Sequence, residues 1–190
     1  MRRKNRKKRD LKSSCVVLVD GESEISYINN IKTSNLKVLP EIPKHKSLKE
    51  MYSMFKEKLK EFDIVFWIID LDVVIRENKL NILKDYIKNY EDNIIINNPC
   101  LEYWFYLHYS QGKNFNNSCD DVIGGLKRVD DFFKNYTKSS KNIKKLTKHL
   151  APRLGKACEN AKNKECCLNS IVSCSQMYKL IEVFSNSKMF

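Results

Sequence analysis

Carboxylate residues follow two apolar segments of the sequence, at the point where each segment ends. The four are Asp20 and Glu24 after the first segment, and Asp70 and Asp72 after the second. Both segments have the composition of strands buried on both faces, and parallel neighbours would bring these side chains to one sheet edge, where open α/β sheets bind ligands. Four carboxylates in one small volume repel one another unless a cation lies among them. The sequence therefore predicts a cation site.

The ligand types indicate which cation this site would hold. Oxygen-only ligation favours Mg²⁺ or Mn²⁺, which keep several waters and bind phosphate oxygens. Asp70 and Asp72 are two residues apart, so they face the same way if the backbone stays extended. Glu24 lies one turn into the expected first helix, where it would bind metal directly or position a water molecule. We therefore expect these residues and Asp20 to be the metal ligands.

Short strands and helices alternate between residues 14 and 109 and would position these side chains. Strands are expected at residues 15–19, 36–39, 64–69 and 94–96, and helices at residues 24–32, 48–61, 79–90 and 100–109. Ser23 and Ser47 are expected to cap the first two helices, and Pro99 suits the first turn of the fourth. Such alternation predicts an α/β fold with a mainly parallel four-stranded sheet and helices on both faces. Right-handed crossovers would place the carboxyl ends of the strands together.

The composition changes after residue 112 and predicts a basic, helical region. Helices are expected at residues 120–136, interrupted at Gly124-Gly125, at residues 141–162, kinked or split by Pro152, and at residues 176–184. We therefore divide the chain into a basic disordered arm (1–12), an α/β core (13–112) and a helical basic extension packed on the core (113–190).

Positive charge is concentrated in two segments and indicates a polyanionic partner. Residues 1–12 carry +7 of the formal net charge of +12, and so dense a basic arm binds nucleic acid more readily than a membrane, because no amphipathic stripe accompanies it. A solubilising tail is the alternative. The arm residues expected to contact phosphate are Arg2, Arg3, Lys4, Arg6, Lys7, Lys8 and Arg9. Lys144, Lys145 and Lys148 lie off the apolar stripe of their helix and would contact phosphate or simply face solvent.

The remaining composition points to a cytoplasmic, globular protein. No apolar run approaches the roughly 20 residues needed to span a bilayer, so no membrane partner is expected. The N-terminus lacks the apolar stretch of a secretory signal. Seven cysteines do not form an extracellular disulfide pattern. For Cys158, Cys166, Cys167 and Cys174 we expect free thiols rather than zinc ligands, because no C-x-x-C pair is present.

Three motifs resemble those of a known family. The segment Val-Asp-Gly-Glu-Ser-Glu ending at Glu24 resembles the strand–turn–helix acidic motif of Toprim domains, and Asp70-Leu71-Asp72 resembles their D-x-D motif. The sequence Asn-Pro-Cys-Leu-Glu-Tyr-Trp from Asn98, with His108 beyond it, resembles a specific segment of the RloB-like family, a Toprim-like group related to OLD-family nucleases. The resemblance covers roughly residues 10–165 and includes the segment Tyr-Thr-Lys that ends at Lys138.

The resemblance implies a Toprim-like fold and a Mg²⁺- or Mn²⁺-dependent nuclease acting on DNA or on an RNA such as tRNA. It also implies prokaryotic anti-phage defence by abortive infection, beside an AAA-type ATPase encoded nearby. The chain has no phosphate-binding loop of the Gly-x-x-x-x-Gly-Lys-[Ser/Thr] type, so ATP hydrolysis would belong to that partner. The implied catalytic residues are Asp20, Glu24, Asp70, Asp72, Glu102 and Lys138. The family usually has Glu where this chain has Asp20, which shortens that side chain by one methylene.

Several alternatives stay open at this level. Asn98 either lines the site or caps the following helix, and Glu102 is either a site residue or exposed. His108 lies six residues beyond Glu102, which turns it to a different side of a helix and favours a hydrogen-bonded core histidine. For function, the rivals are a non-catalytic nucleic-acid-binding subunit on a degenerate Toprim scaffold and nucleotidyl transfer of the primase kind.

Overall fold

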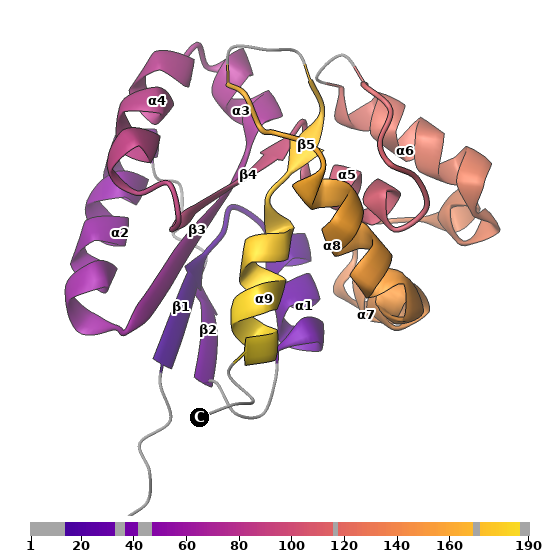
Figure 1. Cartoon of the computed structure of the whole chain (residues 1–190), viewed down its shortest axis with the longest axis horizontal. Helices are drawn as coiled ribbons and strands as arrows, with labels where there is room; N and C mark the ends of the chain where they lie inside the picture. The colour runs from indigo at the N-terminus through magenta and orange to yellow at the C-terminus, as the bar shows by residue number, and fades with distance from the viewer. Residues whose placement is uncertain (1–13, 33–36, 42–46, 116–117, 169–171, 187–190) are drawn as a thin grey trace, which may run out of the picture.

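The protein is built around a five-stranded sheet that lies between two layers of helices, as the computed structural model shows (Figure 1). The structure describes residues 14–32, 37–41, 47–115, 118–168 and 172–186. The strands are β1 (Ser14–Leu18), β2 (Lys37–Glu41), β3 (Ile64–Asp70), β4 (Ile94–Asn98) and β5 (Cys174–Ser175), in the spatial order β2-β1-β3-β4-β5. The first four are parallel and β5 is antiparallel to β4. The predicted α/β class and parallel four-stranded sheet are confirmed, and β5 is an addition that was not predicted from the sequence.

Helices cover both faces of the sheet. Those of the first half of the chain are α1 (Glu22–Ile31), α2 (Leu48–Glu61), α3 (Leu71–Arg76), α4 (Leu80–Asn89) and α5 (Leu101–Leu107). Those of the second half are α6 (Cys119–Val129), α7 (Ser140–Leu150), α8 (Leu154–Lys162) and α9 (Met177–Asn186), with 3-10 turns at Asp131–Asn135 and Ala151–Arg153. Helices α2, α3 and α4 cover one face, and α1, α5 and α9 lie on the other (Figure 1).

The alternation of side chains along each strand divides the core into two layers. Val17 of β1 packs with Tyr27 and Trp104 on the α1 side, whereas Val16 packs with Phe55 and Trp67 on the α2 side. Successive strand residues point to opposite faces, so a strand buried on both sides needs the continuous apolar run found here. The second half of the chain adds its apolar residues to the α1-side layer.

Two helix starts explain how the acidic motifs are placed. Gly21, not Ser23, is the N-cap of α1, so the predicted capping role of Ser23 is wrong and this side chain lies inside the helix. The backbone does not stay extended after Asp70, because α3 begins at Leu71. Asp70 therefore ends a strand, while Asp72 lies in the first helical turn. By contrast, Ser47 caps α2 with a capping box, as predicted.

The C-terminal half differs from the sequence-based expectation in two places. Helix α6 runs through Gly124-Gly125 without interruption and ends at Val129, so the predicted break at the two glycines is wrong. A Cβ atom at Gly125 would lie 2.8 Å from the ring of Phe115, and this close approach accounts for a glycine there. The helix predicted over 141–162 is split, with Pro152 in the 3-10 turn between α7 and α8.

Disulfides join two cysteine pairs, Cys100 with Cys119 and Cys166 with Cys174. The expectation of free thiols is therefore wrong for Cys166 and Cys174, whereas Cys158 is a thiol. The N-terminal arm, including Arg2, Arg3, Lys4, Arg6, Lys7, Lys8 and Arg9, lies outside the described residues. In the part of the chain that the structure describes, no helix is long and apolar enough to cross a bilayer.

Candidate active site

Five carboxylates gather at the edge of the sheet where the parallel strands end. Asp20 closely follows β1, Asp70 is the last residue of β3, and Glu24, Asp72 and Glu102 lie in the first turns of α1, α3 and α5. The register of the sheet pairs Asp70 with Asn97 of β4, which brings the start of α5 beside the end of β3. The structure thus brings together the acidic residues that were predicted from three separate motifs.

Both carboxylate oxygens of Asp70 are held by hydrogen bonds. Its Oδ1 accepts a hydrogen bond from Asn97 Nδ2 at 3.2 Å, and its Oδ2 accepts one from the backbone N–H of Leu101, also at 3.2 Å. Burial raises the pKa of Asp70 well above its usual range, and the nearby charges of Glu24 and Glu102 raise it further. The two hydrogen bonds oppose that shift. Asp70 is therefore fixed in position, in surroundings where a cation would stabilise its charge.

Glu102 is buried rather than exposed, which decides between the two sequence alternatives. Only 1 % of its surface is accessible, and its Oε1 accepts hydrogen bonds from Tyr136 Oη at 2.9 Å and Lys138 Nζ at 3.0 Å. Partial burial lowers the pKa of Lys138, but Glu102, Asp70 and Glu24 more than offset this, so the pKa is raised overall. Lys138 therefore stays charged, and its half-exposed side chain lies beside the carboxylates.

Glu24 folds back over the glycine that caps its helix. A Cβ atom at Gly21 would lie 2.6 Å from Glu24 Oε2, so only glycine leaves room for the carboxylate in this position. Burial raises the pKa of Glu24, and the charges of Glu102 and Asp20 add to the shift, whereas its own backbone N–H and Lys138 oppose it.

Asp20 and Asp72 lie on the α3 side of the cluster. Asp20 is exposed at the rim of a hollow of about 70 Å³ that Glu77 and Lys79 also line. The walls of that hollow limit hydration and raise the pKa of Asp20 to about 6, with further contributions from Glu77 and Asp72. Asp72 Oδ1 is buried and has no hydrogen-bond partner among the described residues. Burial also raises the pKa of Asp72, against an opposing effect of its helix backbone and Arg76.

The donor set fits a hard divalent cation that keeps part of its water shell. All predicted ligands are carboxylates with raised pKa values, and the unpartnered Asp72 Oδ1 is a free acceptor. No three of Asp20, Glu24, Asp70 and Asp72 bring ligand atoms within 4.8 Å of one another. Among the described residues only Cys100, Glu102 and Cys119 do so, and there the two sulfurs are bonded to each other. The arrangement therefore suits an ion held by one or two carboxylates and several waters.

Basic side chains beside the site come from the segment that leads into α7. Ser23 Oγ donates to the backbone oxygen of Lys138 at 3.2 Å, and Ser26 Oγ donates to that of Ser140 at 3.1 Å. These bonds hold the start of α7 against α1. Beyond this point Lys144, Lys145 and Lys148 lie on α7 outside its buried stripe, as the helical pattern predicted.

Two residues that complete the site were not assigned from the sequence. Tyr136 orients Glu102, and Asn97 orients Asp70 while its own Oδ1 accepts a hydrogen bond from Ser175 Oγ at 2.7 Å. Both stand within or beside segments that resemble family motifs, which was the signal available. Asn98 neither caps α5, whose N-cap is Cys100, nor contacts a carboxylate; its amide donates to Val172 O. The expected core position of His108 is confirmed, with Nδ1 bonded to Trp104 O.

Comparisons with known proteins place the chain in one family. A search of curated proteins and a search of solved structures each found no match. A family model described as RloB-like protein matches residues 15–184, which include all five carboxylates and Lys138. The match spans well over half of the 190 residues. The chain therefore belongs to the RloB-like family.

Proposed function

We propose that this protein is a nuclease that hydrolyses phosphodiester bonds of RNA or DNA with Mg²⁺ or Mn²⁺ at a Toprim-like site. The observation that carries this proposal is the cluster of carboxylates around Asp70, four of them with raised pKa values, with Lys138 beside it. Buried carboxylates that raise one another's pKa are costly without a cation, and clusters of perturbed acids mark functional sites more often than structural ones.

The side chains have separable tasks in this proposal. Asp70, fixed by Asn97 and Leu101, would hold the ion directly, and Asp72 and Glu24 would contact it through bound waters or as a second direct ligand. When bound, Mg²⁺ or Mn²⁺ would polarise the scissile phosphate and lower the pKa of a bound water. Lys138 would place its ammonium group near the phosphate oxygens and counter the negative charge that develops on them.

In this proposal Glu102 and Tyr136 position Lys138 rather than contact the substrate. Tyr136 donates to the same oxygen that receives the lysine, so the buried carboxylate has a second partner when Lys138 turns toward substrate. Asp20 is the weakest of the proposed ligands, since it is exposed and its side chain is one methylene shorter than the glutamate usual in the family.

Charge and family membership support the wider setting. The lysines of α7 and the basic arm would supply sequence-independent phosphate contacts. Such contacts favour a nucleic-acid substrate but do not distinguish DNA from RNA. We propose that the protein acts in the cytoplasm of a prokaryotic cell, in abortive infection against phage, with a separate AAA-type ATPase as partner.

Incubation of the purified protein with plasmid DNA and with total RNA tests the proposal. We expect cleavage in Mn²⁺ or Mg²⁺, none in EDTA, and a reduction of at least about 100-fold in Asp70→Asn, since the ligand charge is removed while the shape is kept. Asp85→Asn on α4 is the matched control, because Asp85 is exposed and remote from the cluster. Tight binding without cleavage in any metal would instead establish a non-catalytic nucleic-acid-binding subunit.

A further inference from the structure

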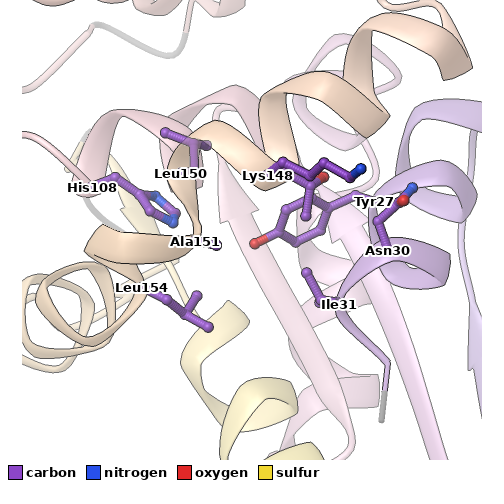
Figure 2. Close-up of a pocket in the computed structure, with 9 residues that line it drawn as sticks. Tyr27, Asn30, Ile31, His108, Lys148, Leu150, Ala151 and Leu154 are labelled. Carbon is purple, nitrogen blue, oxygen red and sulfur yellow. The ribbon is translucent and has the colours of Figure 1, made fainter. Parts of the chain in front are cut away.

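A cavity of about 270 Å³ lies on the α1 side of the sheet, between α1, the end of α5 and the α7–α8 turn. Figure 2 shows its lining residues, which are Tyr27, Asn30, Ile31, His108, Thr147, Lys148, Leu150, Ala151 and Leu154. None of them belongs to the carboxylate cluster. The volume is far above the roughly 30 Å³ that one water occupies and close to the lower limit of small-molecule pockets, about 300 Å³.

The imidazole of His108 supplies an unused acceptor at the inner end of this cavity. Nδ1 lies 3.0 Å from the carbonyl oxygen of Trp104, which can only accept, so the ring proton is on Nδ1. Nε2 is then a lone-pair acceptor, and it is buried without a hydrogen-bond partner among the described residues. Burial lowers the pKa of His108 to about 4, which keeps the ring neutral near pH 7. Buried acceptors in proteins are nearly always satisfied, and no described residue satisfies this one, so it is open to a donor from a ligand.

Tyr27 supplies a donor on the opposite wall. The Tyr27 oxygen accepts a hydrogen bond from Trp104 Nε1 at 2.5 Å. Among the described residues, none accepts the proton of the Tyr27 hydroxyl. Burial raises the pKa of Tyr27, so the hydroxyl stays protonated. In Figure 2 the hydroxyl of Tyr27 and the ring of His108 point toward the same space from opposite sides.

The rest of the cavity is graded from apolar to polar. Leu150 and Leu154 line its inner part, and Ile31 lies on the α1 wall (Figure 2). Asn30 and Lys148 are exposed and stand at its outer end. Apolar walls with a few convergent polar groups are typical of small-molecule sites.

We propose that this cavity binds a planar nitrogen heterocycle of one or two rings that carries an N–H donor on one side and a ring-nitrogen acceptor on the other. The N–H would donate to His108 Nε2, the acceptor would receive the Tyr27 hydroxyl, and the ring would contact Leu150 and Leu154. Lys148 would favour ligands with negative charge at the outer end. This site is separate from the proposed nuclease site and does not depend on it.

The test uses the full chain and a matched pair of probes. Isothermal titration of benzimidazole, whose N–H and acceptor nitrogen point to different sides of the ring, should show binding to the wild-type protein. Its N-methyl analogue, which lacks the donor, should bind at least about 10-fold more weakly, since a buried acceptor then stays unpaired. His108→Phe should weaken the N–H probe to the level of the N-methyl analogue and leave the latter unchanged.

Two further variants separate cavity binding from surface binding. Ala151→Trp fills the cavity from an exposed position and should abolish binding of both probes, whereas Gly155→Ala, with nothing within 4 Å of its added Cβ, should not change it. Circular dichroism confirms that each variant is folded. Equal affinity for the two probes, unchanged binding in His108→Phe, or no binding to the wild-type protein would each overturn the proposal.

Discussion

Asp70 is held in place by hydrogen bonds, although its surroundings disfavour its negative charge. Two hydrogen bonds hold the carboxylate, yet burial and two neighbouring acids raise its pKa. A raised pKa in the folded state means that the folded protein binds the proton more tightly than the unfolded chain does. Without metal, the contribution of such a group to stability is therefore greatest below its unfolded pKa and is lost as pH rises through the folded pKa.

This linkage predicts a pH-dependent difference between wild-type protein and Asp70→Asn. In EDTA, the melting temperature of the wild-type protein should fall relative to the variant as pH rises above about 4, the usual pKa of an aspartate, by roughly 2–4 °C for each kcal/mol of stability removed. Asp20, with a pKa of about 6, should lose its own contribution between about pH 4 and 6 in both proteins. Mn²⁺ should raise the melting temperature of the wild-type protein but not that of Asp70→Asn, and so remove the pH-dependent difference between them. A difference in melting temperature that does not change with pH would contradict the assigned environment of Asp70.

Substitution of Gly21 should change the position of the Glu24 carboxylate rather than the stability of the protein. In Gly21→Ala the new Cβ meets the end of a flexible side chain, Glu24 Oε2, so the carboxylate should move while α1 still forms. The backbone of Gly21 is extended, with φ at −144°, a conformation that alanine adopts freely. Nuclease activity should fall about 10-fold or more with a stability change below about 1 kcal/mol.

Gly155→Ala serves as the matched glycine control. Residue 155 lies inside α8, and its added Cβ meets nothing within 4 Å. This variant should gain about 0.5–1 kcal/mol and keep full activity, as measured by chemical denaturation and the cleavage assay. Full activity in Gly21→Ala would show that the position of Glu24 does not matter.

At the residue scale, the sequence was informative for residues whose type alone indicates their chemistry. Asp70 and Glu24 could be predicted because carboxylates follow two apolar strand segments, and Glu102 because its segment resembles a family motif. Tyr136 could not, because a tyrosine among apolar residues looks like core until its hydroxyl is seen on Glu102. The burial of Glu102 also depends on packing of distant segments, which a single sequence does not encode locally.

Between elements, the contact of α1 with the start of α7 brings Lys138 to the site. Ser23 and Ser26 lie on one side of α1 and bind neighbouring parts of the same segment. The expected capping role of Ser23 was wrong because the helix starts earlier, at Glu22, and this change turned a predicted cap into a contact between segments. Helix boundaries inferred from local sequence are uncertain by one or two residues, which is enough to change such a role.

Removal of both hydroxyls should loosen the segment that carries Lys138. In the double variant Ser23→Ala/Ser26→Ala we expect activity to fall about 10-fold and stability to fall by about 1–2 kcal/mol, since two partly buried hydrogen bonds are removed. Ser47→Ala, which removes the cap of α2 on the other face of the sheet, should cost a similar amount, about 1 kcal/mol, without reducing activity. An equal fall of activity in the two proteins would show that stability alone explains it.

At the scale of the whole molecule, the two faces of the sheet differ in the partners they present. The α1 face carries the lysines of α7, and the α2 face carries lysines paired or interspersed with acids, such as Lys88 beside Asp85. The fold class and the parallel sheet followed from the alternating pattern and right-handed crossovers. Strand β5 did not, because a two-residue strand has no periodicity to detect.

The lysines of α7 predict a salt-dependent effect on nucleic-acid binding. The variant Lys144→Gln/Lys145→Gln/Lys148→Gln should bind RNA and DNA more weakly, and the slope of log affinity against log salt should become shallower by about 0.7–0.9 for each phosphate that is no longer neutralised. Lys56→Gln/Lys60→Gln/Lys88→Gln on the opposite face is the charge-matched control. Fluorescence anisotropy between about 50 and 200 mM salt measures both. An equal drop in the control would mean that only net charge matters.

The return of the chain through β5 and α9 to the edge of β4 has a consequence for when the protein becomes active. Ser175 binds Asn97, which orients Asp70, and Leu180 and Phe184 of α9 pack into the α1-side core. A nascent chain that has not yet released these residues from the ribosome lacks both interactions. For the proposed nuclease, the messenger and ribosomal RNA that surround it during translation would be protected until α9 has been synthesised and has packed on the sheet.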